Sequence, residues 1–152
     1  MQTDPSTLLH DLVEEHARLE ARARALGPPE VNPRYESELR SLTGDLRSYC
    51  QLTDRSLGRI LRARAPDTPV AHRLRRCRER LDEAIDACFR VGTGSGADRA
   101  LRMLREKMTA LFALERRYVF PATHYLMSPA TLTRIEAYYS DMKRIEGSSS
   151  AG

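Results

Sequence analysis

Four segments of this chain carry an apolar residue at every third or fourth position, a spacing typical of helices that bury one face. No segment alternates apolar and polar residues in the manner of a half-buried strand. The sequence therefore predicts an all-α fold. The four stripes are Leu9, Leu12, His16, Leu19, Ala23 and Leu26; Leu39, Leu42, Leu46, Cys50, Asp54, Leu57 and Leu61; Val70, Leu74, Cys77, Leu81, Ala84 and Cys88; and Leu101, Leu104, Met108, Leu111, Glu115 and Val119.

Proline and glycine mark where the predicted helices begin and end. A side chain that can cap a helix precedes a proline at four places, and proline suits the first helical position because that position needs no amide donor. Links containing glycine or proline follow the first three segments. The capping residues are Asp4, Asn32, Thr68 and Ser128. We therefore predict helices over about 5–26, 33–64, 69–91 and 97–120, and a shorter helix over about 129–146.

Short links between the first four helices predict antiparallel neighbours, and hence an up-down-up-down four-helix bundle. The short fifth helix, at the C-terminal end, would cap or extend this bundle. A chain of 152 residues suits a single domain, which we place at residues 1–146. The Ser/Gly-rich tail, 147–152, is expected to be disordered. Pro121 should kink or end the fourth helix, because proline cannot continue the hydrogen-bond ladder.

The apolar runs are too short for a transmembrane helix or a secretory signal. The three cysteines, Cys50, Cys77 and Cys88, are an odd number without a signal peptide. This count favours reduced thiols over a disulfide scaffold. These features predict a cytoplasmic protein that does not associate with a membrane.

Polar residues interrupt the apolar stripe toward the middle of every long segment. They are His16, Cys50, Asp54, Cys77 and Glu115, and they are expected to share one layer. Carboxylates in such a layer must be paired or hydrogen-bonded, since an isolated buried charge costs several kcal/mol. One interpretation is a metal or small ligand held among the helices. The interpretation that we favour is a polar layer in which His16 bonds to a carboxylate.

The run LFALERRYVFP, from Leu111 to Pro121, resembles the fourth-helix signature H-x-x-x-E-E-x-x-L-F-P of hemerythrin-like (HHE cation-binding) domains. The segment around His16 is similar to the first helix of that family. Cys50-x-x-x-Asp54 stands where the family has H-x-x-x-E. The resemblance covers about residues 6–127 and implies a four-helix bundle with its ligands in the centre.

This chain departs from that family most clearly at the positions of the metal ligands. The family holds two iron ions with histidines and glutamates from all four helices, but Leu111 stands where its fourth-helix histidine should be. The third-helix histidine falls near Cys77 or His72. We therefore expect a degenerate metal site, no di-iron chemistry and no cofactor. A less favoured alternative is one zinc or iron ion on His16, Cys50, Cys77 and Glu115.

The resemblance implies a regulatory or ligand-binding module built on the former metal centre. The residues expected to line that centre are His16, Cys50, Asp54, Cys77, Leu111 and Glu115. One alternative is a small-molecule enzyme with His16 as general base, oriented by Asp54 or Glu115. Another is a mononuclear metal-binding protein. Whether the chain is an enzyme is left open.

A second, looser resemblance is to the regulator-of-sigma-D family of anti-sigma factors. It rests on Glu15-His16, on the run SLGRIL over 56–61 and on the run FALE over 112–115. It implies a transcription regulator that binds helices of a partner through its surface. A protein partner or a small molecule is therefore expected.

The net charge is only +4, but eight arginines gather around the second link. They are Arg59, Arg62, Arg64, Arg73, Arg75, Arg76, Arg78 and Arg80, against Asp67 and Glu79. Such a cluster can receive an acidic protein surface, phosphates or carboxylates, or it can be a solvated face. No aromatic residue lies near it for base stacking, so a nucleic-acid partner is not expected.

Aromatic residues gather near the C-terminal end of the chain, at Tyr118, Phe120, Tyr125, Tyr138 and Tyr139. We expect these rings to pack the fifth helix against the bundle. The alternative is a homodimer interface in this aromatic-rich region, since aromatic residues are enriched at such surfaces.

Overall fold

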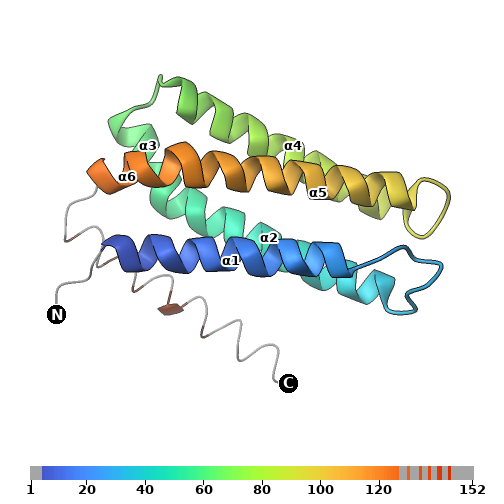
Figure 1. Cartoon of the computed structure of the whole chain (residues 1–152). Coiled ribbons are helices and arrows are strands. Elements are labelled where there is room, and N and C mark those ends of the chain that lie inside the picture. The colour runs from blue at the N-terminus through green and yellow to red at the C-terminus, as the bar shows by residue number, and fades with distance from the viewer. Residues whose placement is uncertain are drawn as a thin grey trace.

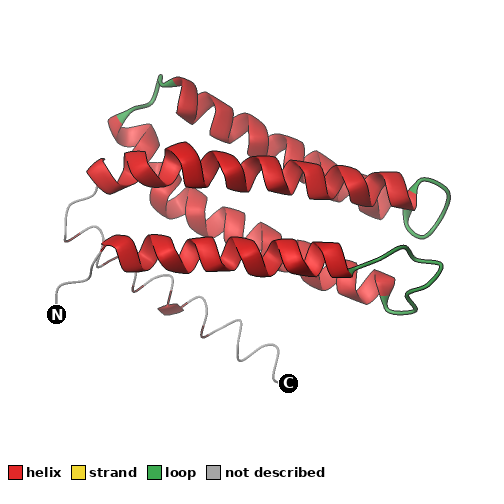
Figure 2. Cartoon of the chain, viewed as in Figure 1, coloured by secondary structure: helices red, strands yellow, loops and turns green. Residues whose placement is uncertain are grey.

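The computed structural model describes residues 5–126 and the separate positions 130, 134, 137, 140, 141 and 144. Every regular element in this part of the chain is helical, so the all-α prediction is confirmed (Figure 2). The elements are α1 (Pro5–Ala25), α2 (Tyr35–Thr53), the π-helical turn η1 (Asp54–Gly58), α3 (Arg59–Arg64), α4 (Pro69–Val91), α5 (Ala97–Leu114), the π-helical turn η2 (Glu115–Val119) and α6 (Phe120–Leu126).

The predicted segments 33–64 and 97–120 each correspond to a continuous helical stretch with a π-helical turn inside it. The first stretch is α2–η1–α3 and the second is α5–η2–α6. The predicted fifth helix over 129–146, the tail 147–152 and the rings of Tyr138 and Tyr139 fall outside the continuously described residues. Their packing and the homodimer interface therefore stay predictions.

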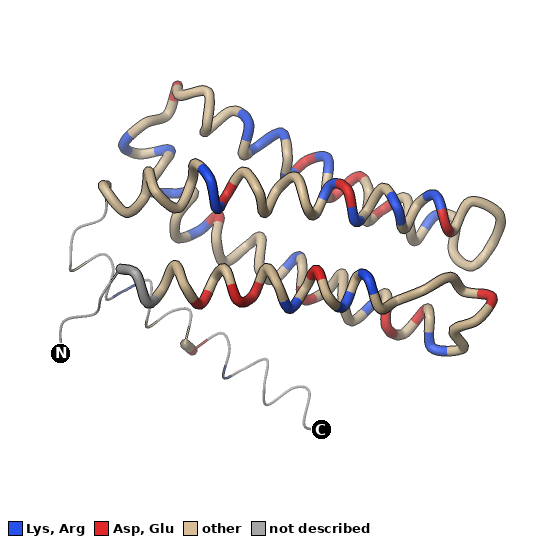
Figure 3. The backbone as a smooth tube through the Cα atoms, in the orientation of Figure 1, with Lys and Arg blue, Asp and Glu red and all other residues tan. Residues whose placement is uncertain are grey.

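The long helices lie side by side along most of their length (Figure 1). The most extensive contact is between α4 and α5; α1 contacts both α2 and α5, and α3 contacts α6. The core consists mainly of leucines from all four long segments, among them Leu19, Leu46, Leu81 and Leu104. Each buried leucine contributes about 1.5–3 kcal/mol, so these stripes supply most of the stabilisation. Lys and Arg recur along each long segment (Figure 3).

The predicted helix cap is present at the start of α4 and absent at the start of α2. The Thr68 side chain accepts a hydrogen bond from the Ala71 amide at 3.3 Å, with Pro69 at the first position of α4. Asn32 does not cap α2, which begins at Tyr35. Its side chain instead donates to the Leu26 carbonyl at 2.6 Å and closes the loop after α1. Its Oδ1 accepts from the Arg34 amide at 3.0 Å, in the turn that precedes α2.

Pro121 does not end its helix, which continues through α6 to Leu126. The amide of Phe120 donates to the carbonyl of Glu115, five residues back, so the turn before the proline is π-helical. Proline in a regular helix clashes with the carbonyl four residues earlier. A widened turn at that place relieves the clash, and the prediction of an end near residue 120 is therefore wrong.

Among the described residues, no helix is both long and apolar enough to cross a lipid bilayer.

Candidate functional site

Three polar side chains meet in the middle of the molecule, each from a different long segment. They are His16 of α1, Tyr49 of α2 and Glu115, the first residue of η2, and their exposures are 0%, 4% and 1%. His16 Nε2 lies 2.5 Å from the Tyr49 hydroxyl and 3.4 Å from Glu115 Oε1. The Tyr49 hydroxyl lies 3.2 Å from the same carboxylate oxygen. The structure thus brings together His16 and Glu115, two of the residues that interrupt the apolar stripes.

The hydrogen bonds of this cluster have a fixed direction. The Tyr49 hydroxyl donates to Glu115, so its oxygen is left to accept from His16 Nε2. The other imidazole nitrogen, Nδ1, lies 3.3 Å from Arg116 Nη1, which can only donate. These contacts assign a neutral imidazole with its proton on Nε2. A donor chain therefore runs from Arg116 through His16 and Tyr49 to Glu115.

The phenol of Tyr49 keeps its proton in this setting. Burial, and then the nearby Glu115 carboxylate, raise the pKa of Tyr49 well above its ordinary value. Tyr49 therefore acts as a hydrogen-bond donor to Glu115 near neutral pH.

Aromatic rings close the centre around His16. Its ring stacks on Phe112, with centroids 4.0 Å apart and planes at 8°, and on Phe120 at 5.5 Å. Tyr49 meets His16 edge-on at 5.3 Å. Leu111, at the position of the histidine in the family that the sequence resembles, is fully buried in the core. The centre is filled by side chains, and solvent does not reach His16.

The centre lacks the donors that a metal ion needs. One oxygen is free to act as a metal ligand, because Glu115 Oε2 is buried and has no hydrogen-bond partner. A single oxygen is too little, because zinc takes four ligands and a di-iron site draws them from several helices. Within the described part of the chain, no three His, Cys, Asp or Glu side chains form a group that could hold a metal. The residues present therefore do not fit the di-iron centre that the resemblance implies.

The structure also tests the alternative of a single metal ion held by His16, Cys50, Cys77 and Glu115. Cys50 and Cys77 are both partly exposed, and Cys77 lines a hollow between α4 and α5 beside Arg73 and Arg76. The structure does not gather the four residues around one point.

The thiols are poorly suited to nucleophilic or redox chemistry. Burial, followed by the charge of Glu115, raises the pKa of Cys50 to about 12. Burial also raises the pKa of Cys88 to about 11. Because the thiolate is the reactive form, both cysteines are inert near neutral pH.

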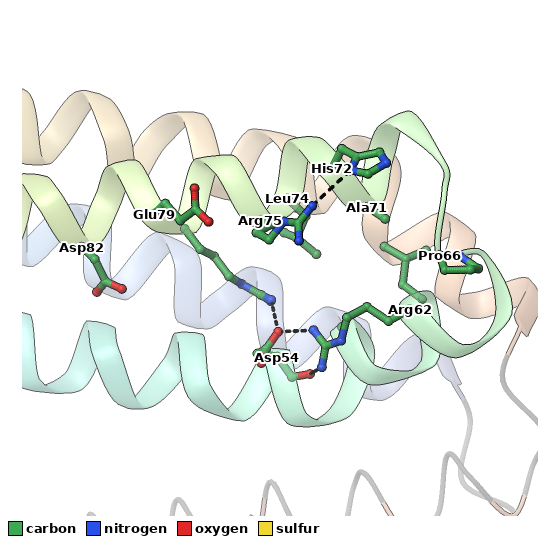
Figure 4. A pocket seen from close by; sticks show the side chains of 12 residues that line it. Asp54, Arg62, Pro66, Ala71, His72, Leu74, Arg75, Glu79 and Asp82 are labelled. Carbon is green, nitrogen blue, oxygen red and sulfur yellow. Dashed lines mark hydrogen bonds and ion pairs between the residues drawn. The ribbon is translucent and has the colours of Figure 1, made fainter.

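Asp54 lies apart from the centre, at the start of η1, with a side chain that is 42% exposed. Its Oδ1 accepts from Arg62 Nη1 at 2.5 Å and from Arg78 Nη1 at 2.6 Å (Figure 4). These three residues line a pocket of about 450 Å³ between α3 and α4. Arg75 lines it as well and lies against His72, with Arg75 Nη2 3.3 Å from His72 Nδ1.

Gly58, at the end of η1, lets the two guanidinium groups approach Asp54. A Cβ at this glycine would lie 3.0 Å from Asp54 Oδ1 and 3.1 Å from Arg78 Nη1. Arg78 also donates to Thr53 Oγ1 at 3.2 Å, while its Nε is buried and has no partner. The Asp54 ion pairs therefore hold Arg78 by its terminal nitrogens, while its Nε is enclosed.

Six of the eight arginines expected around the second link line one or the other of two separate hollows. Arg62, Arg75 and Arg78 line the Asp54 pocket. Arg73, Arg76 and Arg80 line the hollow between α4 and α5. The aromatic residues also divide, because Phe120 is buried beside His16 whereas Tyr125 is 88% exposed.

The residues of the centre that the stripes do not include are Tyr49, Phe112, Arg116 and Phe120. Tyr49 lies three positions after Leu46 and one before Cys50, so the same apolar spacing allowed either residue. Counting three residues on from Leu46, rather than four, predicts Tyr49 instead of Cys50 at the buried position. Arg116 carries no periodic signal, because it reaches His16 from the helix surface.

Comparisons with protein-family models, curated proteins and solved structures found no match to this chain.

Proposed function

We propose that the protein is an up-down-up-down four-helix bundle of the hemerythrin-like type that has lost its di-iron site. In this proposal it is a single-domain regulatory or ligand-binding module of the cytoplasm. The LFALERRYVFP run over 111–121, with Leu111 at the histidine position, supports the relationship. The former metal centre is then a structural hydrogen-bond network.

The observation that carries this proposal is the sealed position of His16. Its ring has no exposed surface and stacks on Phe112. A general base must come within hydrogen-bond reach of the proton that it removes. His16 Nε2 is instead directed at the Tyr49 hydroxyl, and Asp54 is engaged by two arginines elsewhere. Binding at the surface is therefore favoured over chemistry in the centre, as an anti-sigma-like regulator would also require.

Elemental analysis of the purified protein tests the metal-free centre. We expect no stoichiometric iron or zinc, and an unfolding midpoint that a chelator leaves unchanged, because a folded-state metal would stabilise the protein by mass action. Iron approaching two equivalents per chain would overturn the proposal.

A second candidate function is the binding of a small carboxylate- or phosphate-bearing ligand in the Asp54 pocket. The specific observation is that three arginines, Arg62, Arg75 and Arg78, line one pocket. Guanidinium groups bind such planar anions through paired hydrogen bonds. Of the other acids lining the pocket, Asp82 is paired with Arg47 at 3.7 Å, and the carboxylate of Glu79 points away from Asp54 in Figure 4.

Titration with inorganic phosphate and with citrate, followed by amide chemical shifts, tests this pocket. We expect saturable shifts over 54–62 and 72–82 that Arg78→Gln abolishes. Arg76→Gln removes the same charge from the opposite face of α4 and should leave the shifts in place. Equal shifts in both variants would exclude the pocket as the binding site.

A further inference from the structure

The contact between α4 and α5 leaves a groove on its outer side. One hollow of about 450 Å³ lies between the first half of α4 and the end of α5 with η2. A second hollow of about 490 Å³ lies between the second half of α4 and the start of α5. Arg80 lines both, so the two hollows are neighbours along α4. We call the combined feature the α4–α5 groove.

Helical spacing confirms that the two hollows share one side. On α4 the lining positions include Arg73, Arg76, Arg80, Ala84, Ala87 and Val91, which follow each other at three or four residues. On α5 and η2 they include Arg99, Met103, Lys107, Ala110, Leu114 and Tyr118, with the same spacing. Residues at this spacing lie on one face of a helix. At 1.5 Å per residue, Met103 and Tyr118 are about 22 Å apart along the groove.

The rim of the α4–α5 groove is strongly basic. Its charged residues are Arg73, Arg76, Arg80, Arg99, Lys107 and Arg117, against the single carboxylate of Glu83. Within the part of the chain that the structure describes, none of the six basic side chains forms an ion pair. Elsewhere on the surface, arginines such as Arg22, Arg47 and Arg62 are paired with aspartates. The groove thus has an excess of positive charge that no ion pair of the described chain engages.

The floor of the groove is apolar and shallow. Alanines from both helices form much of it: Ala84, Ala87, Ala100, Ala110 and Ala113. Two larger apolar side chains, Met103 and Tyr118, lie toward its ends and are each 41% exposed. Exposed apolar residues rimmed by polar ones are a mark of interaction sites. Small side chains on the floor leave room for another backbone to come close.

We propose that the α4–α5 groove docks an amphipathic helix of a partner protein, with an apolar stripe flanked by acidic residues. The seam between two neighbouring helices is where a further helix packs, and the groove accommodates about four helical turns. Uncompensated arginines select acidic flanks, which pair with guanidinium groups at the rim. A nucleic acid is disfavoured because Tyr118 is the one aromatic residue among those that line the groove. This inference names the partner class of the proposed binding module and rests on that function.

The test uses the full chain and synthetic helical peptides of about 16 residues, the four-turn length given by the helical rise. The probe peptide carries leucines at helical spacing and glutamates on both flanks. A matched peptide has lysines in place of the glutamates, and a single-stranded DNA oligonucleotide is the third ligand. Fluorescence anisotropy gives affinities, and amide shifts locate the contact.

We expect saturable binding of the acidic peptide, with shifts over α4 and α5 and an affinity that falls as salt rises. The triple variant Arg76→Glu, Arg80→Glu, Arg117→Glu should weaken binding at least tenfold. Arg40→Glu, an exposed charge reversal on α2, should leave it unchanged. Circular dichroism shows whether each variant keeps its helices.

Several results would overturn the inference: no saturable binding, equal binding of the lysine peptide, tighter binding of the oligonucleotide, or an affinity that the triple variant retains. The proposed function fails separately, through stoichiometric metal in the same preparation. A metal-free chain that does not bind the acidic peptide would therefore refute the docking groove alone.

Discussion

Tyr49 donates its hydroxyl proton to Glu115 across 3.2 Å in the middle of the molecule, where both side chains are buried. The same hydroxyl oxygen accepts from His16 Nε2, so Tyr49 bridges the imidazole and the carboxylate. The centre is thus held by one hydroxyl that links α2 to η2 and to α1.

Replacing Tyr49 by Phe removes this hydroxyl and leaves His16 Nε2 and Glu115 Oε1 short of a partner. We expect the free energy of unfolding to fall by about 2 kcal/mol, because buried polar groups that lose a partner cost 1–3 kcal/mol. Urea denaturation measures the change. Tyr125→Phe alters an exposed ring and should change stability by less than about 0.5 kcal/mol. If Tyr49→Phe and Tyr125→Phe were equally stable, the Tyr49 hydroxyl would not be stabilising the buried cluster.

Leu111 fills core volume at the position of a lost ligand. Leu111→Ala should destabilise the protein by about 3 kcal/mol, since a buried cavity opens, whereas Leu111→Met should cost less than about 1.5 kcal/mol. Leu111→His should also lose stability and should still bind no iron, because the other ligands are not gathered there. Stoichiometric iron in Leu111→His would contradict this assignment of the centre.

Stability should fall as the pH rises through the alkaline range. The pKa of Cys50 is raised from 9.0 to about 12, and that of Cys88 to about 11, both chiefly by burial. Between pH 9 and these values the unfolded chain loses thiol protons that the folded chain keeps, so stability is full below pH 9 and declines above it. Tyr49 acts in the same direction.

Urea midpoints measured from pH 7 to pH 11 check this dependence. Cys50→Ala and Cys88→Ala should each flatten the alkaline decline, even if they lower stability at pH 7. Profiles parallel to that of the parent chain would refute the buried-thiol explanation.

Gly58 makes room for the ion pairs of Asp54. In Gly58→Ala the new Cβ would press on Asp54 Oδ1 and Arg78 Nη1, and we expect a loss of about 1 kcal/mol as these bonds lengthen. Gly44→Ala is a matched control, because Gly44 lies in α2 with nothing within 4 Å of its Cβ position. That change should stabilise the protein by about 0.5–1 kcal/mol. Thermal unfolding compares the two, and a gain at both glycines would mean that the ion pairs tolerate the Cβ.

Much of the fold could be predicted from the sequence, because the signals that define it are local. Pro69 and Thr68 fix the start of α4, and the glycines at 92 and 96 adopt the positive φ angles that end α4 and precede α5. The apolar stripes then determine which faces are buried. Asn32 was misassigned because its bond to Leu26 depends on how the loop folds back.

The candidate site was only partly predictable, because it depends on contacts between distant segments. Asp54 occupies an apolar position of its stripe, but its carboxylate is 42% exposed and pairs with Arg78, 24 residues later. Tyr49 and Cys50 compete for the same inward position, and spacing alone does not choose between neighbours. A regular period also gives no sign of a π-helical turn.

Both π-helical turns begin at acidic residues, Asp54 and Glu115, and each holds one residue more than a regular turn over the same length. Removing one residue from 115–119 would return that turn to the α-helical form. Because the extra residue is held within the turn, α6 would keep close to its present orientation relative to the bundle, but Pro121 would again clash with the carbonyl four residues earlier. The same deletion within 97–114 would turn the leucines that follow it out of the core. Each π-helical turn therefore holds its extra residue without turning the buried faces that follow it out of the core.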